Sequence, residues 1–306
     1  MRLIKTEDAV GHVLCHDMTQ IIKDQYKDAR FRKGHVVTEE DIPVLLSMGK
    51  EHLYVWEMTS GMVHENDAAE RLLALCGQEN MIRSGVKEGK IELKAACDGV
   101  FLVDSARLVA VNSQDEVMIA TRKGGMAVRE GDKLAGMRVI PLIIEEEKLR
   151  KAEQAAGDKP LLSLKPYVRK TACIVATGGE VKKGLIKDTF TPVVIDKLKT
   201  YGIETLEVVY SGDGVENVRD AVLAMREKKP DMILCTGGMS VDPDDNTPGG
   251  IKAAGANIIA YGAPVLPGAM FLLGYFDDGM PVMGLPGCVM YAGATVFDLV
   301  LPKIAA

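Results

Sequence analysis

Hydrophobic and polar positions are arranged differently in the two halves of the chain. From residue 171 onward, short apolar runs of strand length alternate with amphipathic segments of helical length. Such alternation is typical of βα units, which bury a mainly parallel sheet between helices on both faces. The pattern predicts strands at 171–176, 204–210, 231–235, 257–261 and 281–285, and helices at 188–201, 215–228, 247–254 and 291–300. We therefore expect an open α/β fold for this half.

The first 145 residues are patterned as smaller modules. A short helix is expected at 39–49, a strand at 51–55 and a longer helix at 60–77, whose apolar side chains share one face. Short strands and turns then follow one another. The predicted strands lie at 90–95, 100–103, 108–111, 117–121 and 134–139. This half is expected to consist of α+β and β modules.

A charged, helix-forming run marks the boundary between the two patterns. It covers Glu145–Ala156 and is broken by Gly-Asp-Lys-Pro at 157–160. The expected domain organisation is an N-terminal α+β module (1–60), a strand-rich module (61–145), a helical linker (146–170) and an α/β domain (171–306).

Composition narrows the class of protein. Of 306 residues, 47% are hydrophobic and 26% are charged, which is typical of a globular protein with substantial cores. The net charge of −6, without a basic run, argues against nucleic acid as the main partner. Apolar runs fall short of the roughly 18 to 20 residues of a membrane span. With no signal-like start and six scattered cysteines, we expect a cytoplasmic protein without a disulfide framework.

Two common kinds of catalytic site are disfavoured. All five histidines lie within the first 64 residues, and none belongs to an HExxH zinc motif. Because residues 171–306 contain no histidine, a Ser-His-Asp hydrolase is excluded there. Cys288 follows a glycine loop, but a structural role is expected for it rather than a reactive thiol.

Glycine loops follow four of the predicted strands. Parallel strands end at a common sheet edge, which is where open α/β folds bind ligands. Loops on that edge would form one pocket, whereas four unrelated tight turns would also require glycine. The loops lie at 177–180, 211–214, 236–238 and 285–287.

Carboxylates accompany these loops. Glu180 and Asp245 each follow one, and Asp213 lies within another. Carboxylates at this edge suit a hard cation such as Mg²⁺ that holds a phosphorylated small molecule. The alternative is that they are solvated loop acids or helix caps, and we expect Asp242 and Asp244 to be solvated neighbours of the site. Asp188-Thr189 would similarly cap a helix, or face a phosphate at the helix start.

In this order, the motifs resemble the molybdopterin-binding domain shared by molybdopterin adenylyltransferases and molybdopterin molybdenumtransferases. The resemblance covers about 171–304, whereas the N-terminal half is only distantly similar to the longer molybdenumtransferases. The resemblance over 171–304 rests on a TGxE loop, an xGGxS loop with a following Asp, an LPG loop and a DS/N-type helix start. These stand here as Thr177-Gly178-Gly179-Glu180, Gly237-Gly238-Met239-Ser240 with Asp245, Leu285-Pro286-Gly287, and Asp188-Thr189.

The resemblance implies binding of molybdopterin, a phosphorylated pterin dithiolene, or its adenylylated form, with Mg²⁺ during molybdate insertion. It implies metal binding by Glu180 and Asp245 and a catalytic role for these two and Asp213. It also implies a homo-oligomer that meets molybdate and other cofactor-synthesis proteins or molybdoenzymes. The ligand-binding positions would be Thr177, Gly178, Gly179, Asp188, Thr189, Gly237, Gly238, Ser240, Pro286 and Gly287.

Three departures from the family pattern bear on activity. Phe190 replaces the usual Asn, Cys288-Val289 replaces Asn-Pro, and Leu266–Met270 lacks both lysines of the KPGKP loop. Those lysines would balance phosphate or molybdate charge. An enzyme of the molybdenumtransferase type is the leading hypothesis. The alternatives are a non-catalytic molybdopterin or cofactor carrier, chaperone or sensor, and a nucleotide pyrophosphatase on the same fold.

Overall fold

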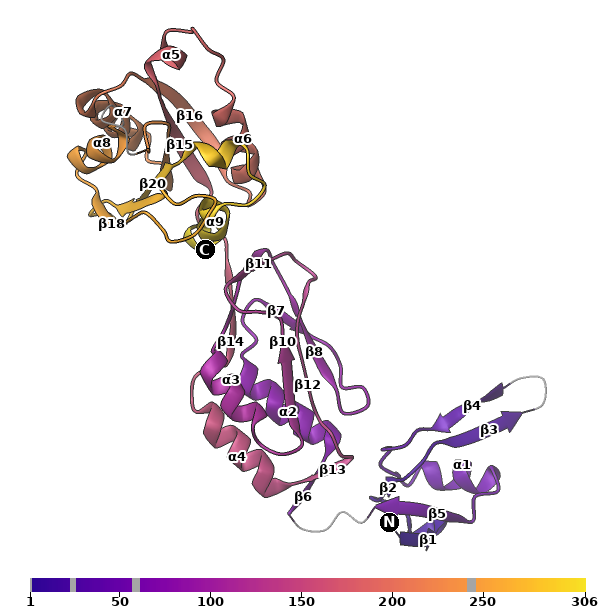
Figure 1. Ribbon diagram of the computed structural model, residues 1–306. Helices are drawn as coiled ribbons and strands as arrows, with labels where there is room; N and C mark the ends of the chain where they lie inside the picture. The colour runs from indigo at the N-terminus through magenta and orange to yellow at the C-terminus, as the bar shows by residue number, and fades with distance from the viewer. Residues whose placement is uncertain (1, 23–25, 57–60, 241–245) are drawn as a thin grey trace. The chain divides into compact units, whose positions relative to one another are not determined.

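The computed structural model describes residues 2–22, 26–56, 61–240 and 246–306 and divides into two compact units (Figure 1). The first unit comprises residues 1–97, 101–124 and 130–164. The second comprises residues 98–100, 125–129 and 165–306. Within the described ranges, no helix is long and apolar enough to cross a membrane.

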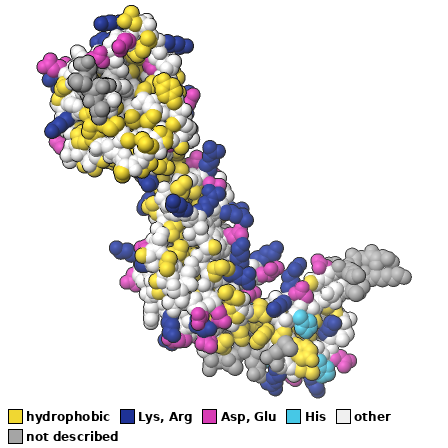
Figure 2. Space-filling model, in the orientation of Figure 1, with side chains coloured by type: hydrophobic (Ala, Val, Ile, Leu, Met, Phe, Trp, Pro, Cys, Tyr) yellow, Lys and Arg dark blue, Asp and Glu magenta, His cyan; other side chains and the backbone are white. Residues whose placement is uncertain are grey.

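The first unit begins with a small antiparallel sheet in the order β1-β5-β2, beside a hairpin of β3 and β4. Leu14, Leu45 and Leu53 are fully buried and form its core with Val55. In Figure 2, histidine side chains appear on this N-terminal part. Basic and acidic side chains are interspersed over the surface in the same view. The elements are β1 (Arg2–Lys5), a 3-10 turn (Thr6–Asp8), β2 (Val13–Leu14), β3 (Met18–Ile22), β4 (Tyr26–Phe31), α1 (Asp41–Ser47) and β5 (His52–Trp56).

The rest of the first unit is built on an antiparallel sheet in the order β10-β12-β8-β7, with α2, α3 and α4. A short ladder joins β6 to β13. The elements of this stretch of chain are β6 (Met62–His64), α2 (Glu65–Cys76), β7 (Met81–Arg83), β8 (Ile91–Ala95), β9 (Gly99–Val103), α3 (Ser105–Asn112), β10 (Val117–Thr121), β11 (Met126–Val128), β12 (Lys133–Val139), β13 (Ile143–Glu145), α4 (Glu146–Ala156) and β14 (Leu162–Pro166).

The strand predicted at 108–111 is wrong, because these residues belong to helix α3. A short apolar run cannot by its period alone distinguish a strand from a helix. The deciding signal lies just before it, where the Asp104 carboxylate accepts a hydrogen bond from the Arg107 amide at 3.1 Å and caps the helix.

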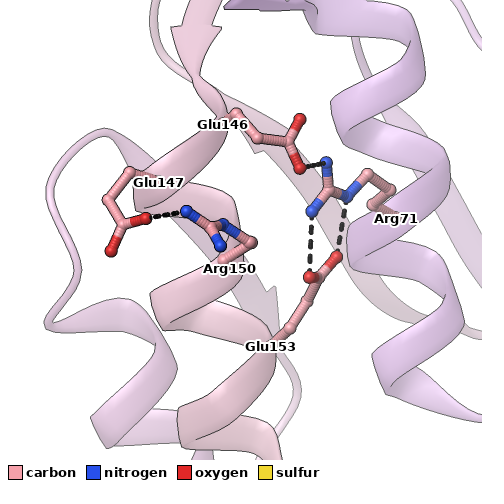
Figure 3. A network of polar contacts seen from close by, with 5 residues as sticks. All are labelled: Arg71, Glu146, Glu147, Arg150 and Glu153. Atoms are coloured by element: carbon pink, nitrogen blue, oxygen red, sulfur yellow. Dashed lines mark hydrogen bonds and ion pairs between the residues drawn. The ribbon is translucent and has the colours of Figure 1, made fainter. Parts of the chain in front are cut away.

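An arginine joins α2 to α4 (Figure 3). Arg71 Nε and Nη2 donate to the Glu153 carboxylate at 2.7 and 2.9 Å, and Nη1 donates to Glu146 at 2.8 Å. These hydrogen bonds, with Glu153 foremost, raise the pKa of the guanidinium. A second pair, Arg150 with Glu147, lies on α4 alone. Of the two arginines, Arg71 therefore connects elements distant in sequence.

The second unit contains a six-stranded sheet in the order β16-β15-β17-β20-β19-β18. The first four strands are parallel, β19 pairs antiparallel with β20, and β18 pairs antiparallel with β19. The predicted α/β class with a mainly parallel sheet is confirmed. The elements are β15 (Thr171–Thr177), α5 (Gly179–Lys182), α6 (Phe190–Lys199), β16 (Glu204–Ser211), α7 (Val215–Glu227), β17 (Met232–Thr236), α8 (Thr247–Ala253), β18 (Asn257–Tyr261), β19 (Leu272–Tyr275), β20 (Pro281–Leu285), a 3-10 turn (Gly287–Met290) and α9 (Val296–Ala305).

Helices cover both faces of this sheet, as predicted. Alternate residues of β15 point to opposite faces, with Ile174 packing into a core with α6 and α9 and Val175 into a core with α7 and α8. Both residues are fully buried. Cys235 on β17 is buried as well, which raises the pKa of its thiol to about 12. Strand β19 was not predicted, and the last helix begins at Val296 rather than at 291.

An acidic side chain ties β15 to β17 at the edge where these strands begin. Asp231 Oδ2 accepts hydrogen bonds from the Lys170 amide at 2.7 Å and from the Thr171 amide and hydroxyl at 2.9 Å each. Burial opposes ionisation of this carboxyl, but the hydrogen bonds outweigh it and lower its pKa. The start of β15 is therefore held by the carboxylate that directly precedes the neighbouring strand β17.

Helices α7 and α8 approach closely at a glycine. A Cβ added to Gly250 would lie 2.4 Å from Val218 Cβ and 3.1 Å from the Val215 carbonyl oxygen. Only a residue without a side chain allows this separation of the two helices.

Replacing Arg71 with Met should destabilise the protein by about 1–2 kcal/mol, because three charge-assisted hydrogen bonds between α2 and α4 are lost. The matched control Arg150→Met removes an exposed pair within one helix and should cost at most about 0.5 kcal/mol. Urea unfolding followed by circular dichroism measures both. Equal losses for the two variants would contradict a connecting role for Arg71.

Gly250→Ala should destabilise the protein by about 1–3 kcal/mol, because the added methyl group forces α7 and α8 apart. Gly293 has no heavy atom within 4 Å of an added Cβ, so Gly293→Ala serves as the control. It should change the free energy of unfolding by less than about 0.5 kcal/mol. Thermal unfolding of the two variants tests this, and a neutral Gly250→Ala would refute the close contact.

Candidate functional site

The four glycine loops lie at one edge of the sheet, as the sequence predicted. In the parallel register Thr177 is paired with Ser211, Ala176 with Thr236, and Thr236 with Leu285. Each of the four strands therefore ends at the same level, and each is followed directly by its loop. This is the carboxyl edge, where open α/β sheets bind ligands.

Two threonines hold the centre of this edge together. Thr177 Oγ1 donates to the Thr236 carbonyl oxygen at 2.8 Å and lies 3.2 Å from Thr247 Oγ1. Thr247 Oγ1 in turn donates to the Gly237 carbonyl oxygen at 2.9 Å, and Thr247 is fully buried. Thr247, at the start of α8, was not among the predicted site residues. The Asn-Thr-Pro sequence before a helix was the available signal.

The two loop glycines after β17 fit against these threonines. Gly237 has φ +81°, and a Cβ there would lie 2.5 Å from the Thr177 carbonyl oxygen. Gly238 has φ +57°, and a Cβ there would lie 2.6 Å from Thr247 Oγ1. Both positions therefore require glycine for conformation and for space.

The loops after β15 and β16 are joined by hydrogen bonds. The Gly179 amide donates to Asp213 Oδ2 at 3.0 Å, and the Gly178 amide donates to the Ser211 carbonyl oxygen at 3.2 Å. Asp213 therefore connects two loops, with its side chain exposed at the edge. Glu180 is exposed as well, and its Oε2 lies 3.9 Å from where a Gly178 Cβ would stand.

Asp188 caps helix α6. Its Oδ1 accepts hydrogen bonds from the amides of Phe190 at 2.9 Å and Thr191 at 3.0 Å. Burial opposes ionisation of this carboxyl, but the hydrogen bonds outweigh it and lower its pKa. The side chains of Thr191 and Tyr210 lie near the same carboxylate and contribute to that lowering of its pKa. Thr189 is exposed, and its hydroxyl lies 3.1 Å from Met290 Sδ.

The remaining predicted positions differ in their exposure, and some of them lie outside the described residues. Ser240 and Gly287 are exposed at the ends of their loops, and Pro286 is buried. Asp245, with Asp242 and Asp244, lies outside the described residues, so of the predicted metal pair only Glu180 is described. Within the described ranges, no group of three or more His, Cys, Asp or Glu side chains is arranged to hold a metal ion.

A lysine that the sequence reading missed lies at this edge. The position of a Cβ added to Gly212 is 3.8 Å from Lys182 Cδ and 3.9 Å from its Nζ, so the side chain extends over the loop after β16. Lys182 makes no ion pair with another residue that the structure describes. The pair Lys182-Lys183, two residues after Glu180, was the signal that could have identified it.

Two family models match the chain. Residues 173–306 match the model described as "Probable molybdopterin binding domain", and residues 3–57 match a domain of unknown function, DUF8806. Curated relatives include CinA-like proteins of Mycobacterium tuberculosis (strain H37Ra) and Petrotoga mobilis, which are 33% and 32% identical over 76 residues. This segment covers 25% of the chain and only 18% and 19% of those relatives.

Solved structures with some similarity include the molybdopterin biosynthesis enzyme MoaB of Thermus thermophilus, at 18% identity and a TM-score of 0.38. That match covers 44% of this chain and 90% of the other. The molybdopterin biosynthesis MoeA protein of Pyrococcus horikoshii matches at 16% identity over 79% of each chain, with a TM-score of 0.37. These scores are too low to carry an argument.

The family model covers almost all of the second unit's six-stranded sheet and its four loops. The motifs that carried the resemblance at 177–180, 237–240 and 285–287 lie within the matched range. The carboxyl-terminal part of the chain, residues 173–306, is therefore a member of the molybdopterin-binding domain family.

Proposed function

We propose that the protein binds molybdopterin or its adenylylated form at the carboxyl edge of the second unit's sheet, together with Mg²⁺, and acts in molybdate insertion. The observation that carries this proposal is the convergence of four glycine loops on one edge. In particular, Gly237 and Gly238 carry backbone amides at positions where no side chain fits beside Thr177 and Thr247. Such amides suit the close approach of a phosphate.

The acidic residues at this edge have the chemistry to hold a hard cation. Glu180 and Asp213 are exposed on adjoining loops, and neither forms an ion pair with a described residue. Carboxylate oxygens are preferred ligands of Mg²⁺. We assign Glu180 and Asp245 to the metal and Asp213 to its vicinity. The bound ion would neutralise phosphate charge, which an acidic protein would otherwise repel.

The chain's own residues would act mainly by positioning. The loops bind the phosphate through backbone amides, Asp188 fixes the start of α6, and Asp213 holds the loop of Gly179 in place through its hydrogen bond. Lys182 offers a cation at the same edge, which compensates in part for the lysines absent from Leu266–Met270. Charge neutralisation and orientation would then favour attack of water on the phosphate bond of the adenylylated ligand, with AMP as the leaving group, or the entry of molybdate.

A carrier, chaperone or sensor without turnover is the second candidate. The absent lysines and Cys288-Val289 in place of Asn-Pro favour it, because these changes remove groups beside the ligand and leave the loops intact. Both candidates bind the same ligand, and turnover separates them. Homo-oligomerisation, contacts with other cofactor-synthesis proteins or molybdoenzymes, and a cytoplasmic location accompany the proposal.

Titration calorimetry with molybdopterin, with and without Mg²⁺, tests the metal assignment. In the wild-type protein, Mg²⁺ should tighten binding at least about tenfold, equivalent to roughly 1.4 kcal/mol. Glu180→Gln and Asp245→Asn should lose that gain, because an amide oxygen carries no charge for the cation. The control Glu227→Gln, at the end of α7, should retain it.

Consumption of adenylylated molybdopterin, measured on the same variants, decides between enzyme and carrier. Turnover that falls in Glu180→Gln supports the enzyme, whereas tight binding without turnover supports the carrier. An unchanged effect of Mg²⁺ in Glu180→Gln would refute the metal assignment, and preference for free nucleotides over molybdopterin would favour the pyrophosphatase instead.

A further inference from the structure

The first unit contains a cavity of about 510 Å³. Its lining residues lie between positions 17 and 143 and so outside the molybdopterin-binding domain at 173–306. That volume lies within the range typical of sites for small molecules. Its lining combines cationic, acidic and aromatic side chains, notably Arg32, Lys33, Trp56, Glu65 and Arg138. A neighbouring cavity of about 470 Å³ shares Arg32, Lys33 and Glu65.

Buried contacts hold the two sides of this cavity together. His64 Nδ1 accepts a hydrogen bond from the Asn66 amide at 3.2 Å, which leaves Nε2 to donate to the Gly34 carbonyl oxygen at 2.8 Å. A Cβ on Gly34 would lie 2.9 Å from Leu142 Cδ2 and 3.2 Å from Glu65 Oε1. The loop after β4 therefore packs tightly against the start of α2.

Glu65 is a buried carboxylate without hydrogen-bond donors. It is 5% exposed, and its oxygens accept no hydrogen bond within the described part of the chain. The nearest cationic group is Arg138 Nη2, at 3.9 Å. Burial, with a smaller effect of Glu88, raises the pKa of this carboxyl. A ligand that donates hydrogen bonds to a buried carboxylate without other donors stabilises the charged form of that carboxylate.

Two other parts of the lining point to the rest of the ligand. Arg32 and Lys33 are exposed at the cavity, and neither side chain forms an ion pair with another described residue. They suit an anionic group such as a phosphate. Trp56 is the only tryptophan of the sequence and supplies an aromatic wall, and its buried Nε1 has no acceptor in the described structure.

We propose that this cavity binds a phosphorylated 2-amino-4-oxopyrimidine ring, the chemistry shared by guanine nucleotides and phosphorylated pterins. The ring N–H and the adjacent amino group form two parallel donors that match the Glu65 carboxylate. Trp56 packs against the ring, and Arg32 with Lys33 binds the phosphate. Adenine lacks this pair of donors and is rejected, because it would leave Glu65 unpaired. The site is independent of the function proposed for the second unit.

Titration calorimetry on the full chain with GMP, neopterin monophosphate and AMP tests the proposal. GMP or the pterin should bind at least about tenfold more tightly than AMP, since hydrogen bonds to a charged group are among the strongest. The tighter of the two identifies the source of the ring. GMP should also change the fluorescence of Trp56, which as the sole tryptophan reports binding at this cavity.

Three variants locate the contacts. Glu65→Gln should remove the preference over AMP, and Arg32→Ser should weaken GMP and AMP alike by about tenfold. Glu79→Gln, exposed on the same unit and outside the cavity, should behave as wild type. Thermal unfolding checks that each variant is folded. If Glu65→Gln does not fold, the binding of GMP and AMP by Arg32→Ser decides, because Arg32 is exposed. Equal binding of AMP, an unchanged preference in Glu65→Gln, or no fluorescence change at millimolar GMP would overturn the proposal.

Discussion

The close approach of the backbone where β15 and β17 end is the constraint on which the candidate site depends. Gly237 and Gly238 leave no room for a side chain between the loop and the two threonines, Thr177 and Thr247. Their hydroxyls link the end of β15 to the loop after β17 and to the start of α8. Two loops and a helix are therefore fixed relative to one another before any ligand binds, which is the preorganisation that tight binding requires.

The opposite edge of the sheet supports this arrangement with a different kind of interaction. There Asp231 holds the start of β15 through three hydrogen bonds, so the strand is restrained at both ends. Between the ends, Ile174 and Val175 are buried in separate cores on the two faces. Acids that stabilise the fold are thus hydrogen-bonded, whereas Glu180 at the carboxyl edge is left to solvent or to a ligand.

The α/β unit could be predicted largely from the sequence because its central strands are buried on both faces and therefore appear as continuous apolar runs. The common edge of the loops followed from that topology. Other features depend on tertiary contacts. The run at 108–111 is helical because of a cap at Asp104, and Lys182 reaches the site by extending over a loop distant in sequence. The carboxylate of Glu65 lies against Gly34 and Arg138, which are distant in sequence, so no local sequence pattern predicts its surroundings.

The central claim is that four loops at one sheet edge form a single site for molybdopterin. Hydrogen exchange of the full chain, with and without molybdopterin and Mg²⁺, tests it most directly because each loop carries amides that report separately. The account predicts slower exchange on ligand binding in all four segments, 177–180, 211–214, 236–240 and 285–288. Binding that leaves these segments unchanged, or that slows exchange only elsewhere in the chain, would contradict it.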